Sequence, residues 1–167
     1  MEIRCHIRWM IRKEMQEVTT IENESFPNPW KEKDFIDCLR TRNCIGMVAE
    51  YDERIVGSMV YELHKARLHI LTFAVHPEFR RQGVGRQMVQ KMIFKLSAQR
   101  RTRIMLEVRE TNLPAQLFFR SCGFVAVNAF KDFYNDTPED AYLMVYRFQQ
   151  EPQAILIPQN RIKGLVK

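Results

Sequence analysis

The feature that most constrains the fold is an apolar strand that leads through a glycine-containing loop into an amphipathic helix. The strand LHILTFAV ends at His76-Pro77, and the loop RRQGVGR (residues 80–86) follows it. The next helix places apolar side chains at the i, i+4, i+5 and i+8 spacing of one buried face: Val84, Met88, Val89, Met92, Ile93 and Leu96. This order predicts a helix that packs on a sheet.

Two helices are predicted in the first forty residues. Residues 13–24 carry an apolar residue at every third position, which is one narrow stripe of an amphipathic helix. The stripe consists of Met15, Val18 and Ile21, and Glu14, Glu17 and Glu22 are expected to face away from it. Asn28 and Pro29 then form an N-cap and first-turn pair for a second helix through Arg40, after a tight kink at FPNPW.

Strand patterns lie on both sides of the glycine loop. Residues 45–51 and 54–63 are rich in β-branched and apolar side chains and flank Asp52-Glu53, which predicts a β-hairpin. Near the end, residues 124–130 and 141–148 form a second strand pair around a polar loop.

Between the hairpins, strands alternate with helices. Residues 104–108 form a strand, Asn112 caps a short helix through Cys122, and Gly123 ends that helix. Alternation in the middle and hairpins at both ends predict an α/β class protein with a mixed sheet and helices on both of its faces.

The length of 167 residues fits one domain. We expect it to span residues 1–148, with a tail over residues 149–167, where two prolines interrupt a stretch without a clear period. No segment resembles a signal peptide or approaches the length of a membrane span.

The four cysteines lie far apart and form no CxxC pair: Cys5, Cys38, Cys44 and Cys122. This spacing suggests neither a zinc site nor a disulfide framework, and we expect no metal site. A reduced cytoplasm fits such a chain best.

The net charge of +6 is local to one segment. Residues 80–103 hold eight basic side chains and no acidic one, so the remaining residues sum to −2. This segment begins at the glycine loop, where backbone N–H groups and the helix dipole favour a phosphate. A solvated basic helix face is the alternative. The loop lacks the GxxxxGK and GxGxxG patterns, which disfavours a nucleoside triphosphatase or a Rossmann dinucleotide site. Phe94 is the one aromatic residue in 82–103, which disfavours nucleic-acid binding through this helix.

Several motifs in one order resemble the GCN5-related N-acetyltransferases (GNAT superfamily). The family pattern R/Q-x-x-G-x-G/A matches RRQGVG at residues 80–85, within FAVHPEFRRQGVGRQMV. The runs FPNPW, LEVRETNLPAQLFFRSCGF and FYNDTPEDAYLM are most similar to the bacterial ribosomal-protein alanine N-acetyltransferase (RimI-like) branch. The resemblance covers residues 3–148 and implies a three-layer fold around a mostly antiparallel, twisted central sheet.

The resemblance implies that acetyl-coenzyme A (acetyl-CoA) is the co-substrate. Its pyrophosphate would lie on the loop amides of Arg81, Gln82, Gly83, Val84, Gly85 and Arg86. Its pantetheine arm would run antiparallel to Phe73, Ala74 and Val75 and use their backbone groups. Asn112 is similar to a family asparagine that contacts acetyl-CoA, and helix capping explains this residue equally well.

Catalysis requires an amine that has lost its proton. An α-amine with a pKa of about 8 costs under about 1 kcal/mol to deprotonate at pH 7.4, and a lysine costs about 4 kcal/mol. Glu107 is a lone carboxylate in an apolar strand, and the resemblance makes it the proton acceptor through water. An ion pair with Arg109 is the structural alternative. His69 stands where some relatives carry a catalytic tyrosine, so it is a second candidate base or a surface histidine.

The chain departs from the family pattern at Phe119, where RimI-like enzymes usually have a tyrosine that protonates the thiolate. Tyr134 matches a tyrosine of the substrate-side loop and is one replacement. The thiol of Cys122 and a proton delivered by water are the others, and the sequence does not choose between them.

The acceptor side is expected at the kink between the first two helices. Phe26, Pro27 and Trp30 would form a wall of the acceptor groove together with Tyr134, although core packing also explains the first three. Residues 14–37 carry a net charge of −5, so we expect a preference for basic N-terminal peptides.

The motifs therefore favour acetyl transfer to the N-terminal α-amine of a protein, with a ribosomal protein that begins with alanine as the first choice. Attack would be direct, because Cys122 has no evident histidine partner for a covalent intermediate. An internal lysine or a small amine is the alternative acceptor. A coenzyme A-binding module with little turnover is the alternative class. Neither a membrane nor a nucleic acid is expected as a partner.

Overall fold

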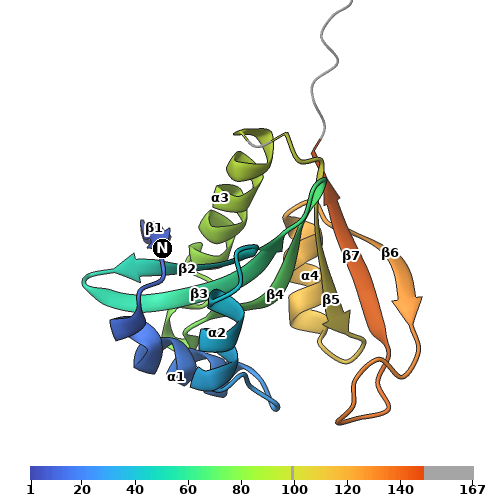
Figure 1. Cartoon of the computed structure of the whole chain (residues 1–167), viewed down its shortest axis with the longest axis horizontal. Coiled ribbons are helices and arrows are strands. Elements are labelled where there is room, and N and C mark those ends of the chain that lie inside the picture. The colour runs from blue at the N-terminus through green and yellow to red at the C-terminus, as the bar shows by residue number, and fades with distance from the viewer. Residues whose placement is uncertain (99, 149–167) are drawn as a thin grey trace, which may run out of the picture.

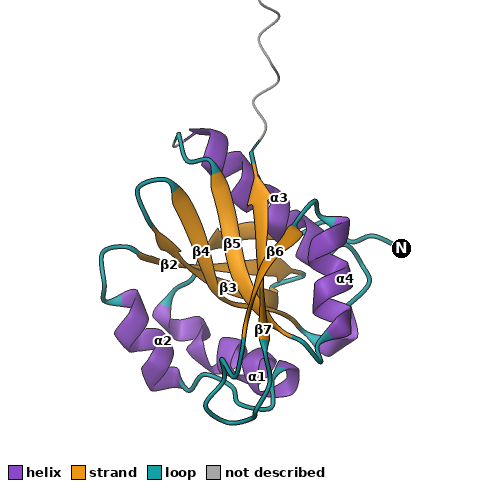
Figure 2. Ribbon diagram, turned by 90° about the vertical axis from the view of Figure 1, so that its right-hand side faces the viewer, coloured by secondary structure: helices purple, strands orange, loops and turns teal. Residues whose placement is uncertain are grey.

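The chain folds around one seven-stranded sheet with helices on both faces, as predicted (Figures 1 and 2). The computed structural model describes residues 1–98 and 100–148, so the predicted tail at 149–167 lies outside the described residues. The strands are β1 His6–Trp9, β2 Cys44–Tyr51, β3 Arg54–Leu63, β4 Arg67–Val75, β5 Arg103–Arg109, β6 Val125–Phe130 and β7 Ala141–Arg147. Their order across the sheet is β1-β2-β3-β4-β5-β7-β6, and β4–β5 is the one parallel pair among the described strands.

Four α-helices cover the sheet: α1 Met15–Ser25, α2 Glu32–Leu39, α3 Val84–Ala98 and α4 Leu113–Ser121. Short 3₁₀ turns precede α1 (Arg12–Glu14) and α3 (Pro77–Phe79). One apolar core joins α3 and α4 to their face of the sheet, and a second core joins α1 and α2 to the opposite face. This arrangement gives three layers. Among the described residues, no helix combines the length and apolar character that a membrane crossing requires.

A bulge in β4 decides where the sheet opens. Val60 of β3 pairs with Thr72, whereas the next residue, Tyr61, pairs with Ile70, so Leu71 is the extra residue in β4. Beyond the bulge the side chains change faces: Ile70 belongs to the α3 core, and Thr72 contacts α1. The parallel pairing of β4 with β5 ends before the bulge, at His69 and Met105, and the two strands part beyond it (Figure 1).

The predicted start of the second helix was wrong. α2 begins at Glu32, and the N-cap is Lys31, whose N–H donates to the Asp34 carboxylate at 2.8 Å. Asn28 and Pro29 instead lie in the connection between α1 and α2. The Trp30 N–H donates to Glu22 at 3.3 Å and ties this connection to α1.

Two of the glutamates expected to face solvent are buried. Glu14 is 3% exposed and forms an ion pair with Arg8, and Glu22 is 2% exposed. Their hydrogen-bond partners come from segments that the helical pattern does not include, because β1 and β4 supply Arg8 and Thr72.

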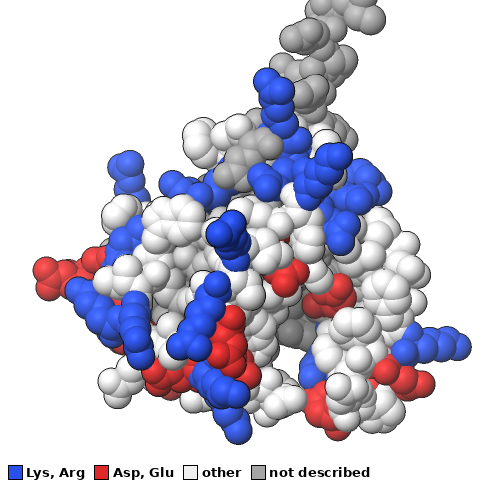
Figure 3. Space-filling model, viewed as in Figure 1, with Lys and Arg blue, Asp and Glu red and all other residues white. Residues whose placement is uncertain are grey.

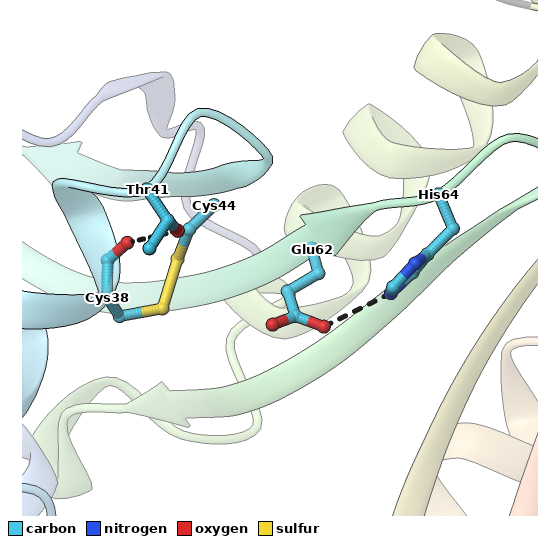
Figure 4. Close-up of a disulfide and its surroundings, with 5 residues drawn as sticks. All are labelled: Cys38, Thr41, Cys44, Glu62 and His64. Atoms are coloured by element: carbon cyan, nitrogen blue, oxygen red, sulfur yellow. Dashed lines mark hydrogen bonds and ion pairs between the residues drawn. A yellow bond between two sulfur atoms is a disulfide. The ribbon is translucent and has the colours of Figure 1, made fainter.

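A disulfide joins Cys38 to Cys44, although the cysteine spacing suggested no disulfide framework (Figure 4). The turn between α2 and β2 brings the two Cα atoms to 6.0 Å, and the Thr41 hydroxyl donates to the Cys38 carbonyl at 2.7 Å within that turn. The cysteines therefore no longer support the expectation of a reducing compartment.

The disulfide closes a short loop, and we expect its reduction to lower the free energy of unfolding by about 2 kcal/mol. Urea denaturation of the oxidised and the reduced chain measures this difference. A variant with Cys38→Ser and Cys44→Ser should unfold at the same urea concentration with or without reductant. Equal midpoints for the oxidised and reduced wild-type chain would contradict the prediction.

Candidate active site

A cavity lies where β4 and β5 part. Its volume is about 490 Å³, within the range of small-molecule sites. The α1–α2 segment forms one wall, β4 and β5 form the floor, and α4 and the loop before β7 close the other side. Residues that the sequence singled out occur on every wall: Phe26, Pro27, Trp30, Phe73, Glu107, Asn112, Phe119 and Tyr134.

Glu107 lies on β5 and presents its carboxylate to this cavity. Its Oε2 is 2.7 Å from Nε2 of His69 on β4, and both side chains are about one-fifth exposed. The alternative pairing with Arg109 does not occur, because that guanidinium contacts Asp136 at 2.9 Å and Glu139 at 3.4 Å. His69 is not among the residues that line the cavity, so its contact with Glu107 lies outside that lining.

Tyr134 lies across the cavity on the loop between β6 and β7. The Arg109 guanidinium is 3.8 Å from the centre of its ring, a cation–π contact that ties the loop to β5. Burial raises the pKa of Tyr134; Arg109 opposes this shift, and Glu107 adds to it. The phenol therefore stays protonated at neutral pH and is able to donate a proton.

Phe119 fills the place of the family tyrosine with an apolar ring. It is 4% exposed and packs edge to face against Phe73, Phe118 and Phe124, at centroid distances of 5.0–5.4 Å. Burial raises the pKa of the nearby Cys122, so this thiol is mostly protonated at neutral pH and is a poor nucleophile.

The glycine loop has the backbone of an anion site. Arg81 and Gly83 have φ values of +63° and +82°, and α3 begins directly after them at Val84. The N–H groups of a first helical turn have no partner within the helix, so this end of α3 offers donors to a phosphate. A Cβ at Gly85 would lie 2.9 Å from the Phe118 ring, which keeps this position small.

β4 offers a free edge beside the loop. Phe73, Ala74 and Val75 pair with β3 on one side, whereas β4 has no paired residue of β5 beyond His69 among those described. This edge is suited to an extended ligand that bonds as an added strand would.

Asn112 and the FPNPW residues have structural contacts and also lie on the cavity wall. The Asn112 side chain accepts the Ala115 N–H at 3.2 Å and so caps α4, and it also lines the cavity. Trp30 packs edge to face on Phe35 at 5.3 Å and also forms the cavity wall with Phe26 and Pro27.

Glu22 is a cavity residue that the sequence analysis missed. Its carboxylate accepts the Thr72 hydroxyl at 2.7 Å and the Trp30 N–H at 3.3 Å. Burial raises the pKa of Glu22, and these two hydrogen bonds oppose the shift. The helical period carried a signal, because Glu22 lies four residues after the buried Val18.

Charge is divided over the molecule. Acidic side chains border the hollow in the face drawn in Figure 3. Basic side chains crowd the upper part of this face. The cavity itself is lined by the carboxylates of Glu22, Glu107 and Glu139 and by one arginine, Arg109, which is paired with Glu139.

A glycine loop that opens a helix, a free strand edge and a carboxylate in the cavity between them are the parts of a transferase with a phosphate-bearing donor. The chain belongs to the acetyltransferase (GNAT) family, whose model matches residues 15–124. The protein is therefore an acyltransferase, and acetyl-CoA is its co-substrate.

One similar protein is named for the acetylation of a ribosomal protein, and another is solved with a bisubstrate analogue. A putative ribosomal protein bS18-alanine N-acetyltransferase of Bacillus subtilis is 28% identical over 86% of this chain and 96% of its own length. Naa50 of Arabidopsis thaliana, solved with the bisubstrate analogue CoA-Ac-MVNAL, is 22% identical with a TM-score of 0.76 and covers 87% of this chain and 100% of its own.

Ard1 of Thermoplasma volcanium has a TM-score of 0.81 and 26% identity, and the match covers 89% of this chain and 100% of the other. Together, these likenesses confirm the predicted fold class.

The buried Glu22 generates a stability prediction. Glu22→Ala leaves the Thr72 hydroxyl and the Trp30 N–H without their acceptor, and we expect it to lower the free energy of unfolding by about 2 kcal/mol or more. Glu22→Gln keeps an oxygen acceptor and removes a buried charge, so its loss should stay within about 1 kcal/mol. Urea denaturation compares the two variants, and equal midpoints would refute the role of these hydrogen bonds.

Proposed function

We propose that the protein transfers the acetyl group of acetyl-CoA to the N-terminal α-amine of a protein. The first-choice acceptor is a ribosomal protein that begins with alanine, and such an acceptor places the enzyme in the cytoplasm. The observation that carries the proposal is the cavity at the open edge of β4, which has Glu107 on one side and the protonated Tyr134 on the other. The similarity to the Bacillus subtilis relative supports this acceptor class.

The donor would lie along the strand–loop–helix segment. Residues 81–86 would hold the pyrophosphate on their amides, and the edge of Phe73, Ala74 and Val75 would bind the pantetheine arm. This path directs the thioester into the cavity between β4 and β5. Asn112 at its far wall would contact the donor while it caps α4.

The chemistry is direct attack in a ternary complex. The α-amine nitrogen bonds to the thioester carbon, the carbon–sulfur bond breaks, and the amine proton passes through water to Glu107. A carboxylate suffices as this proton relay, because deprotonating an α-amine with a pKa of about 8 at pH 7.4 costs under about 1 kcal/mol. His69 holds the carboxylate at 2.7 Å and is the second candidate for carrying the proton away.

Tyr134 would return a proton to the departing thiolate. Phe119 has no proton to give, and its ring is buried among other aromatic rings. Tyr134 carries a proton at neutral pH and lies on the cavity wall, whereas Cys122 does not line the cavity, so we choose Tyr134 among the three replacements. The direct route also agrees with the raised pKa of Cys122, which disfavours an acyl-enzyme.

The acceptor peptide would enter beside the first two helices. A second hollow of about 460 Å³ adjoins the cavity, shares Trp30 and Tyr134 with it, and is also lined by Asp34 and Asp136. Arg109 also lines this hollow and compensates Asp136, so the negative charge that favours a positively charged peptide end comes from Asp34.

A peptide library tests the acceptor class. We expect acetyl transfer from acetyl-CoA to peptides with a free N-terminus, a preference for alanine first and for basic residues after it, and a weaker preference at high salt. Thiol release and peptide mass are measured together. Transfer to N-terminally blocked lysine peptides would overturn the proposal, and so would acetyl-CoA binding without product from any amine.

The role of Glu107 is tested by Glu107→Gln. We expect kcat to fall about 100-fold with little change in the Kd for acetyl-CoA, because the side chain acts on the acceptor proton and not on the donor. Steady-state kinetics and calorimetry measure the two quantities. The exposed Glu53 lies outside the cavity, and Glu53→Gln is the matched control. Unchanged turnover in Glu107→Gln would remove this residue from the mechanism.

Tyr134→Phe tests the proton donor. The phenylalanine ring still stacks on Arg109, so folding and acetyl-CoA binding should persist while kcat falls at least about tenfold. Tyr51 packs against Phe79 away from the cavity, so Tyr51→Phe is the control and should keep wild-type turnover. Full activity of Tyr134→Phe would assign the proton to another source.

A further inference from the structure

A second group of metal-ligating side chains lies beside the candidate active site. Glu62 and His64 extend from the end of β3 on one face, and the His64 Nε2 is 3.1 Å from the Glu62 Oε2 (Figure 4). His69 stands opposite Glu62 in the pairing of β3 with β4. One ligand atom from each of these three side chains lies within 4.8 Å of the other two. We call these three residues the Glu62–His64–His69 cluster.

The local structure explains this grouping. His64 directly follows β3, and residues two apart in an extended chain project from the same face, which places His64 beside Glu62. Directly opposed residues of an antiparallel pair are close neighbours, which places His69 beside Glu62. The rings of His64 and His69 are 6.4 Å apart between their centroids.

We propose that the Glu62–His64–His69 cluster binds a divalent transition-metal ion of the Zn²⁺ type. Two imidazoles and one carboxylate form a ligand set that Zn²⁺ accepts in proteins, with water in the remaining position. The ligand atoms now lie up to 4.8 Å apart, and binding requires them to close by up to about 1.5 Å, because ligands of one Zn²⁺ ion at about 2 Å lie roughly 3–3.5 Å apart. The side chains have room for this movement, since Glu62 and His64 are each 32% exposed and His69 is 22% exposed.

A bound ion would lower turnover because His69 is a member of the cluster and also contacts Glu107. The same imidazole lies 2.7 Å from the Glu107 carboxylate, so a bound ion restrains the partner of Glu107 and adds positive charge next to it. This part of the inference rests on the proposed function of Glu107. The glycine loop that would hold the donor is not part of the cluster, so the ion lowers kcat and leaves the KM for acetyl-CoA unchanged.

Calorimetry with Zn²⁺ on the oxidised chain, prepared without a histidine tag, tests the site itself. We expect one ion per chain and a Kd that rises at least about tenfold in His64→Gln, because one of three protein ligands is lost. His6 is exposed on β1 and outside the cluster, so His6→Gln should bind as the wild type does. No binding, or equal binding by His64→Gln, would overturn the site. Circular dichroism verifies that the variants fold.

Kinetics test the effect on turnover. We expect Zn²⁺ to lower the kcat of the wild type and a chelator to restore it. We expect His64→Gln to have the wild-type kcat without Zn²⁺ and to keep it when Zn²⁺ is added. If Zn²⁺ binds through His64 and kcat does not change, the inhibitory effect is overturned and the site stands. If the chain acetylates no N-terminal peptide, calorimetry still decides the site, so failure of the proposed function is a separate result.

Discussion

The arrangement of the site depends on one extra residue in β4. The bulge at Leu71 lets the strand pair with β3 along its whole length and stop pairing with β5 after His69. The freed edge of β4, the cavity between the two strands and the position of Glu107 in its floor all follow from that interruption. A sheet with unbroken pairing would satisfy more backbone groups within itself, and it would have no opening at its centre.

The local pattern of the sequence carried most of the fold. The hairpin around Asp52-Glu53, the long apolar face of α3, and the helix between Asn112 and Gly123 were predicted correctly, because each follows from neighbours within a few turns of chain. The bulge was not predicted, because it is a property of two strands in register and not of either strand alone.

The errors share a similar physical reason. Glu22 has a solvent-facing residue type, and its burial depends on Thr72, fifty positions away. The disulfide depends on how the end of α2 turns into β2, and the cysteine spacing alone does not contain that geometry. At the site, residues of the cavity wall were identified through motif resemblance, whereas the pairing of His69 with Glu107 became visible only with the strand register.

Arg109 fixes the loop before β7 through several contacts at once. Its guanidinium binds Asp136 and Glu139 and stacks on Tyr134, so one side chain of β5 anchors most of the loop before β7. Thr137 also accepts a hydrogen bond from Arg109 at 3.0 Å, so Asn135 and Pro138 are the positions between these anchors that can vary with the Arg109 contacts intact. Under the proposed function, acceptor preference and chemistry are then separable, because peptide contacts on the loop can change while Arg109 keeps Tyr134 in place.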